Sequence, residues 1–176
     1  MASRHVSRTI IACITLAGLP VFAQVYAPPA DVKAAVLKHL KTSRDFTLKV
    51  ADQMPDADYG FKLTPPQMSF GEQITHLAQD QAEFLAPFSN EKPNPGKPAS
   101  MNKKDVMTYV RQTFDASIDK VSKLTPAQIS KTYSSGEGSM TGLELLMFLL
   151  DHTTHHRASA EMYLRAKGIT PAEYQF

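Results

Sequence analysis

The segment Leu143–Lys167 reads LELLMFLLDHTTHHRASAEMYLRAK, and its apolar residues recur at steps of three and four. That spacing is the period of an amphipathic α-helix with one buried face. Thr141 and Glu144 form a capping-box pattern at its start, and Gly168 followed by Pro171 is typical of a helix end. The sequence therefore predicts one long helix close to the carboxyl terminus.

Three earlier segments show the same period. They cover Pro29–Gln53, a stretch from Ser69 to about Pro87, and Asn102–Leu124. Ser69 and Glu72 form a second capping-box pattern. Breaks rich in proline and glycine separate the segments, and no convincing run of alternating polar and apolar residues appears between them. Four amphipathic helices predict an all-α fold, a four-helix bundle.

The connections between these helices are predicted to be irregular. Thr125 and Pro126 begin a short turn, and the composition of Tyr133–Ser139 is that of a flexible loop. The polar stretch Ser89–Ser100 is long enough to cross one end of a bundle. At least one connection can therefore be a crossover, and the order of the helices stays open.

The first 23 residues have the pattern of a secretory signal peptide. Arg4 and Arg8 precede an apolar run, Thr9–Leu19, and Val21 and Ala23 supply small residues before a cleavage point. The apolar run is shorter than the roughly 20 residues that cross a bilayer. We expect residues 1–23 to be a signal peptide, residues 24–176 to be the folded domain, and the protein to be secreted or periplasmic. An uncleaved membrane anchor is the alternative.

Cleavage after Ala23 would leave a domain with neither a thiol nor a net charge. It would remove Cys13, the only cysteine, so no disulfide can form within the domain. It would also remove two of the 19 basic residues, leaving 17 against the 17 acidic ones. Such a balance gives no sign of nucleic-acid binding, which needs clustered Lys and Arg. No stable membrane span is expected after cleavage.

Two histidines of the last helix, His152 and His156, are spaced i, i+4 and share a helix face with apolar residues such as Leu149. Two buried imidazoles need partners for all four nitrogens, and one shared metal ion would serve both rings. The alternative is a core histidine bonded to a carbonyl beside a second one in a solvent groove. His155 lies off this direction and is expected behind the pair or exposed, and Arg157 is expected to point away.

A complete metal site needs a third ligand from another helix, since zinc sites usually take three or four protein ligands. The candidates are His39 and His76. By pattern alone His76 fits a ligand and a surface residue equally well, whereas the lysines beside His39 favour a solvated position. Asp80 or Glu83 could orient His76 or serve as a base, with a solvated carboxylate as the alternative.

Two stretches of the chain resemble the DinB-like family of damage-inducible proteins, also called DinB/YfiT-like. They are Met54–Pro65 leading into Ser69–Ala78, and Asp151–Arg157 continuing through Tyr163-Leu164-Arg165 to Gly168–Pro171. Many relatives have Gly-Gln after the arginine, where this chain has Ala158-Ser159. The resemblance covers nearly all of the chain after the leader.

The resemblance implies a four-helix bundle that holds a divalent metal ion, zinc or nickel, on His76, His152 and His156. Three neutral histidines leave at least one coordination position open, which is typical of a catalytic site. The implied activity is that of a thiol-dependent transferase or a hydrolase acting on a small molecule, with a thiol as the expected partner. A metal-binding module without catalysis and a helical module that binds a partner remain as alternatives, and a homodimer is compatible with the sequence.

Overall fold

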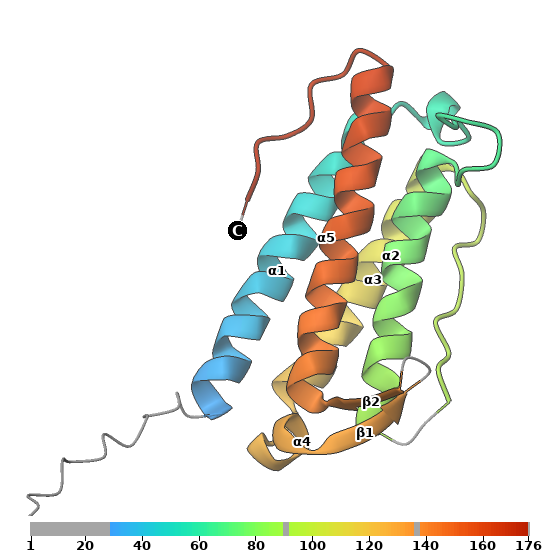
Figure 1. The fold of residues 1–176 in the computed structure, drawn as a ribbon. Helices are drawn as coiled ribbons and strands as arrows, with labels where there is room; N and C mark the ends of the chain where they lie inside the picture. Colours follow the sequence, from blue (N-terminus) through green and yellow to red (C-terminus); the bar gives the residue numbers. More distant parts are fainter. Residues whose placement is uncertain (1–28, 90–91, 136–137, 176) are drawn as a thin grey trace, which may run out of the picture.

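Four long helices pack side by side in the computed structural model, which describes residues 29–89, 92–135 and 138–175 (Figure 1). The predicted all-α bundle is therefore confirmed. The predicted helix ends agree with the structure to within two residues, because caps visible in the sequence fix several of them. The helices are α1 (Pro29–Gln53), α2 (Phe70–Leu85), α3 (Lys103–Ser122) and α5 (Gly142–Ala166).

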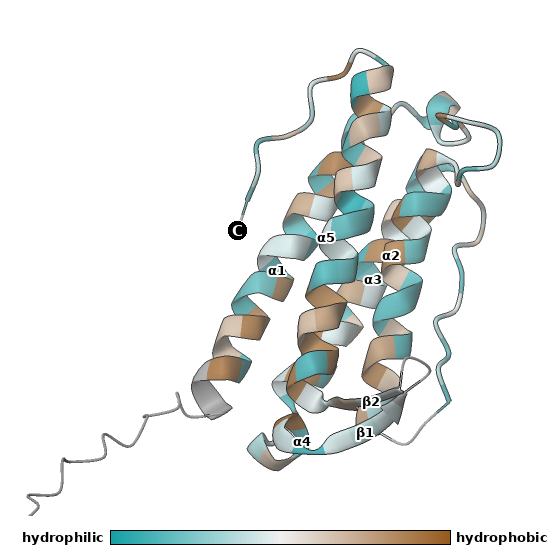
Figure 2. Ribbon diagram, in the orientation of Figure 1, coloured by the Kyte–Doolittle hydropathy of each residue, from teal (hydrophilic) through white to brown (hydrophobic). Residues whose placement is uncertain are grey.

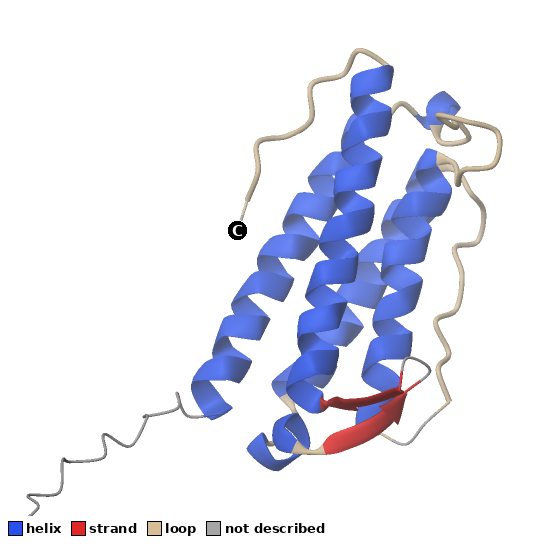
Figure 3. Ribbon diagram, viewed as in Figure 1, coloured by secondary structure: helices blue, strands red, loops and turns tan. Residues whose placement is uncertain are grey.

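Shorter elements lie at both ends of the bundle, and a hairpin replaces the predicted flexible loop at the end where α5 begins (Figure 3). Its strands pair antiparallel, with Tyr133 opposite Met140, and the Tyr133 ring packs on Phe88 with ring centroids 5.1 Å apart. The predicted turn at Thr125 begins a short helix whose capping box is completed by Gln128. These elements are η1 (Asp56–Asp58), η2 (Ala86–Phe88), α4 (Pro126–Ser130), β1 (Thr132–Ser135) and β2 (Gly138–Thr141).

The helix order includes the crossover that the long connections allowed. α1 packs on α3 and α5, and α2 packs on the same two helices, so the order around the bundle is α1, α3, α2, α5. In Figure 1 the chain ascends in α1 and α5 and descends in α2 and α3. The connection from α2 to α3 accordingly runs back along the whole length of α2. This places the segment 97–101 beside the amino-terminal half of that helix.

The apolar faces of the helices meet inside the bundle, and polar residues cover much of the outside (Figure 2). Burial of this apolar surface is the main favourable contribution to folding, because the domain has no disulfide to support it. The largest fully buried side chains include Leu40, Phe46, Phe70, Ile74, Leu77, Phe114, Leu145, Leu149 and Tyr163.

The two ends of the chain differ in what the structure describes. The predicted signal peptide, residues 1–23, lies outside the described residues. Within the described part, none of the helices has the length and apolar character that a bilayer crossing requires. At the other end, the chain after α5 turns back on α1, where Gln53 bonds the backbone oxygen of Thr170 at 2.9 Å and the backbone nitrogen of Ala172 at 2.7 Å.

Candidate metal centre

The predicted metal ligands His76, His152 and His156 come together where α2 packs on α5. One ring nitrogen from each histidine lies within 4.8 Å of those of the other two. The ring of His156 is central, since its centroid lies 4.4 Å from that of His76 and 4.4 Å from that of His152. The packing of two antiparallel helices thus adds a third imidazole to the i, i+4 pair that the sequence shows within α5.

Local sequence fixes where each histidine stands. The α2 helix begins at a capping box, in which the Ser69 hydroxyl accepts from the Glu72 backbone nitrogen and the Glu72 carboxylate accepts from that of Ser69. His76 then follows near the middle of α2. The corresponding box of Thr141 and Glu144 starts α5. The two caps therefore set the phase of the helical faces on which the ligands stand.

Asp80 joins two of the three histidines. Its two carboxylate oxygens lie 3.3 Å from Nδ1 of His76 and 3.0 Å from Nε2 of His152. A carboxylate only accepts hydrogen bonds, so these contacts favour a proton on each of the two ring nitrogens. The orienting role considered for Asp80 thus agrees with its contacts. Glu83 instead is exposed to solvent.

Gln73 holds the third histidine in the same manner. Its side-chain oxygen lies 2.7 Å from Nδ1 of His156, so this nitrogen donates and Nε2 keeps its lone pair. No pattern in the sequence assigned a role to Gln73. The one signal that could have pointed to it is its spacing, since Gln73, His76 and Asp80 recur at three- and four-residue steps on one helix face.

These contacts leave one nitrogen on each ring available to a ligand. They are Nε2 of His76, Nε2 of His156 and Nδ1 of His152. The last is buried and has no hydrogen-bond partner among the described residues. A buried imidazole nitrogen without a partner is unfavourable, and a bound cation would satisfy it. The donor set therefore fits a divalent ion that binds nitrogen ligands, such as zinc or nickel.

Burial favours the neutral form of His152 and His156, which is the form that binds metal ions. Burial, together with the neighbouring rings of His152, His76 and His155, lowers the pKa of His156 to about 4. Burial also lowers the pKa of His152, while the charge of Asp80 opposes that shift. Both rings are thus held ready to donate a lone pair.

The histidines stand at the edge of the buried face of α5 rather than at its centre. Because α5 packs on α1 as well as on α2, a second strip that includes Thr153 and Arg157 is buried. Arg157 points away from the histidines, as expected. The expectation that it also points away from the buried interior was wrong. Arg157 is 3% exposed, and its guanidinium donates to the Ser43 hydroxyl and lies over the Phe46 ring.

The remaining candidate histidines lie outside the cluster. His39 is exposed on α1, as its lysine neighbours indicated. His155 is exposed as well, and its ring contacts that of His156, with a centroid distance of 4.9 Å. Of the two candidates for the third position, the structure brings only His76 to the pair.

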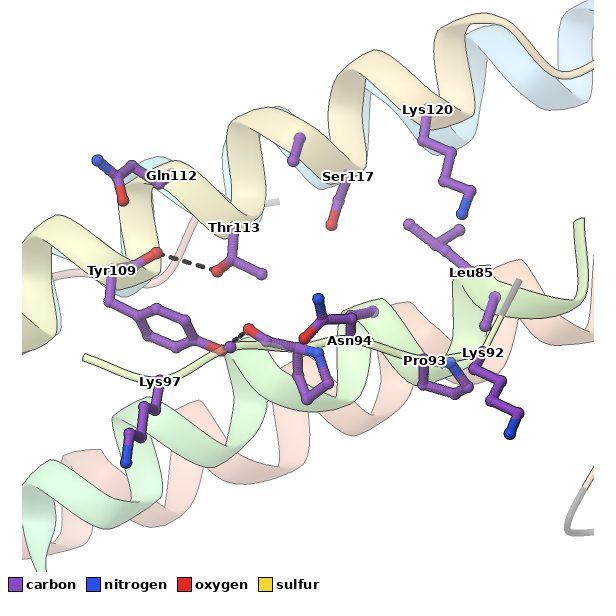
Figure 4. A pocket seen from close by; sticks show the side chains of 15 residues that line it. Leu85, Lys92, Pro93, Asn94, Lys97, Tyr109, Gln112, Thr113, Ser117 and Lys120 are labelled. Atoms are coloured by element: carbon purple, nitrogen blue, oxygen red, sulfur yellow. Dashed lines mark hydrogen bonds between the residues drawn. The ribbon is translucent and has the colours of Figure 1, made fainter. Parts of the chain in front are cut away.

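A cavity of about 510 Å³ opens beside His76, between α2 and the segment 97–101. A second cavity of the same volume lies farther along the crossover segment, between α2 and α3 (Figure 4). Tyr109 crosses it and donates to the Pro95 carbonyl. None of the described residues that line this second cavity is a histidine or a carboxylate, so of these two cavities only the first includes a residue of the cluster.

The fold and the site together define a class of protein. It is a helical bundle in which three histidines cluster on two antiparallel helices. A sequence model of the DinB family matches residues 29–176, and the chain belongs to that family.

Known proteins are similar to this chain over most of their length. It is 22% identical over 143 residues to the Bacillus subtilis (strain 168) protein named "Uncharacterized protein YjoA", covering 77% of this chain and 90% of that protein. A crystal structure of a DinB-like protein from Bacillus cereus ATCC 10987 superimposes with a TM-score of 0.71 at 18% identity, covering 81% of this chain and 97% of that one. The crystal structure of the DinB-like protein YjoA from Bacillus subtilis gives 0.69 at 19% identity, covering 80% and 96%. These likenesses show the fold.

Proposed function

We propose that this protein binds one divalent metal ion, zinc or nickel, through His76, His152 and His156. The observation that carries the proposal is the arrangement of ring nitrogens described above. Each histidine turns one ring nitrogen toward Asp80 or Gln73, and one ring nitrogen of each lies within 4.8 Å of those of the other two. Carboxylate or carbonyl acceptors behind metal-binding histidines fix the tautomer and the ring orientation.

We further propose that the site is catalytic, in a thiol-dependent transferase or a hydrolase. A divalent ion held by three neutral ligands supplies Lewis acidity, which favours the deprotonation of a thiol or of water. His76 lines a cavity of about 510 Å³, in which a substrate would bind beside it. Asp80 is already occupied by two histidines, so its part is to position them rather than to accept a proton from substrate.

Metal analysis of purified protein tests the binding step. Zinc or nickel should be present at one ion per chain, and His76→Ala and His156→Ala should each lose it. His39→Ala is the matched control, because His39 is exposed and apart from the cluster. Retention of full metal content by both cluster variants would contradict the proposal.

A panel of thiol acceptors and esters tests the catalytic step. Metal-free protein reloaded with zinc or nickel should turn over at least one substrate of the panel, with a thiol as cosubstrate for transfer. Metal-replete protein without turnover would favour the alternative of a metal-binding module. Absence of stoichiometric metal would favour a helical module that binds a partner.

We also propose that the protein is secreted or periplasmic, as the leader pattern before residue 24 indicates. Amino-terminal sequencing of protein recovered from an expressing bacterium tests this. A mature chain that begins at Gln24 in the periplasmic fraction is the expected result, and an intact leader in the membrane fraction would support the anchor instead.

A further inference from the structure

The cavity beside His76 has a polar and an apolar side that together suit one class of ligand. Its walls come from α2 and from the crossover segment that returns along it. The lining side chains used below are Met68, Thr75, His76, Lys97 and Met101.

Thr75 supplies a hydrogen-bonding group with no partner. It is 6% exposed, and its hydroxyl makes no hydrogen bond to any described residue. Thr47 of α1 shares this state, whereas the hydroxyls of Thr153 and Thr154 donate to the carbonyls four residues earlier, at 2.8 and 2.9 Å. A buried hydroxyl left without a partner is unfavourable. Because Thr75 lines this cavity, a ligand bound there is the group that would supply the missing partner.

Lys97 supplies an unpaired positive charge. No carboxylate among the described residues forms an ion pair with it. Lys97 lines both cavities, and Figure 4 shows its side chain at one end of the second one. The one carboxylate in the lining, that of Glu72, already accepts from the Ser69 backbone and lies 3.7 Å from Lys62.

Met68 and Met101 supply the apolar side. Both are exposed hydrophobic side chains, at 38% and 44% of their accessible surface. Methionine is flexible and polarizable, so such a pair can adapt to an aliphatic body of varied shape.

We propose that this cavity binds a small organic carboxylate with an apolar body. Lys97 attracts the carboxylate, Thr75 donates a hydrogen bond to it, and the two methionines cover the aliphatic portion beside His76. The inference deepens the proposed function and rests on it, because it assigns the class of substrate that the three-histidine site receives.

Binding of pentanoate, followed through the methyl resonances of Met68 and Met101, tests the proposal. Pentanoate should bind more tightly than pentanol, and pentylamine should bind most weakly. Lys97→Met should weaken pentanoate binding about fivefold, as for the loss of an exposed ion pair, and leave pentanol unchanged. Lys92→Met is the matched control, since Lys92 lines only the second cavity and should have no effect.

Thr75→Val tests the hydroxyl with little change in side-chain volume. It should weaken pentanoate binding about fivefold, whereas Thr75→Ser should retain it. Pentanoate binding no tighter than that of pentanol, or equal affinity in Lys97→Met and wild type, would overturn the inference.

Titrating both metal-free and zinc-loaded protein separates this inference from the proposed function. Protein that takes up zinc but shows no Lys97-dependent pentanoate binding would overturn the inference alone. Protein that binds pentanoate through Lys97 but takes up no metal would overturn the proposed function alone.

Discussion

The side-chain oxygen of Gln73 lies 2.7 Å from Nδ1 of His156, across the seam between α2 and α5. An amide oxygen only accepts, so the proton of His156 is fixed on Nδ1 and the lone pair on Nε2. A glutamine that lies far from His156 in the sequence therefore selects the tautomer of a metal-ligand candidate. Loss of this contact would free the ring to rotate and to exchange tautomers.

Gln73→Leu should lower zinc affinity by about 10- to 100-fold while leaving the fold intact. The leucine keeps most of the side-chain volume but cannot accept the ring proton. Competition with a chromophoric chelator measures the affinity. Gln112→Leu on α3, which faces away from the cluster, should bind zinc as wild type does, and equal affinities of all three proteins would rule out a tautomer-fixing role for Gln73.

Asp80→Asn should have a larger effect, because Asp80 accepts from His76 and from His152. Asparagine retains one acceptor oxygen and turns an amide group, a donor, toward the other ring. A loss of zinc affinity toward the upper end of about 10- to 100-fold is expected, measured with the same chelator. Glu83→Gln removes an exposed charge from the same helix and should change little. Equal losses of zinc affinity in Asp80→Asn and Glu83→Gln would mean that Asp80 contributes only its charge and not its contacts with the two rings.

The fold could be predicted where its determinants are local. Helix periods and capping boxes such as Thr141 with Glu144 lie within a few residues of sequence, and they define the helices of the bundle. The hairpin could not be predicted from local patterns, because its strands are only four residues each and Tyr133 is held by a ring contact with the distant Phe88. The order of the helices likewise depends on which apolar faces meet, which no local pattern specifies.

The same distinction between local and long-range determinants applies to the candidate site. The spacing of His152 and His156 is a property of one helix, so periodicity alone identified the pair. His76 joins them only because α2 packs antiparallel on α5, and its selection came from the family resemblance. The contacts of Gln73 depend on side-chain conformation across two helices, for which the sequence has no signal.

Arg157→Ala should destabilise the protein by about 2–4 kcal/mol, because it empties a buried site and removes the bond to Ser43. Arg157→Met should cost less than about 1.5 kcal/mol, since it keeps much of the packing against Phe46 without burying a charge. Urea unfolding measures both, and Arg165→Ala, exposed on the same helix, is the control. If the alanine and methionine variants are equally unstable, the hydrogen bond rather than the packing dominates.

Glu161→Gln should stabilise the protein at neutral pH. Burial raises the pKa of Glu161 above its usual 4.5, against the attraction of Arg157 and Arg165. The folded protein thus binds a proton at Glu161 more tightly than the unfolded chain does. Above the pKa that Glu161 has in the folded protein, its ionised carboxylate therefore opposes folding. The gain from glutamine should shrink as the pH falls through that pKa and vanish below 4.5. Urea unfolding across this range measures it. Glu173→Gln in the exposed tail should show no such trend, and a gain independent of pH would exclude the charge as its cause.

Gly142→Ala should destabilise the protein by about 1–3 kcal/mol, because the start of α5 has no room for a methyl group. A Cβ at this position would press on the backbone oxygen of Gln128 and lie 2.8 Å from Cε1 of Phe88 and 2.9 Å from Cα of Ile129. The backbone of the short α4 helix can yield only by moving away from α5. Thermal unfolding monitored by circular dichroism measures the loss.

Gly60→Ala is the matched substitution in open space, since nothing lies within 4 Å of a Cβ added there. It should shift stability by less than about 0.5 kcal/mol. A loss in Gly142→Ala no larger than that of Gly60→Ala would mean that α4 moves freely against α5. Because Thr141 caps α5 and pairs with Thr132 in the hairpin, a loose α4 would also loosen the end of the helix that carries His152 and His156. A large loss confined to Gly142→Ala would instead show that this end of the bundle is rigid, and that α5 presents its two histidines from a fixed base.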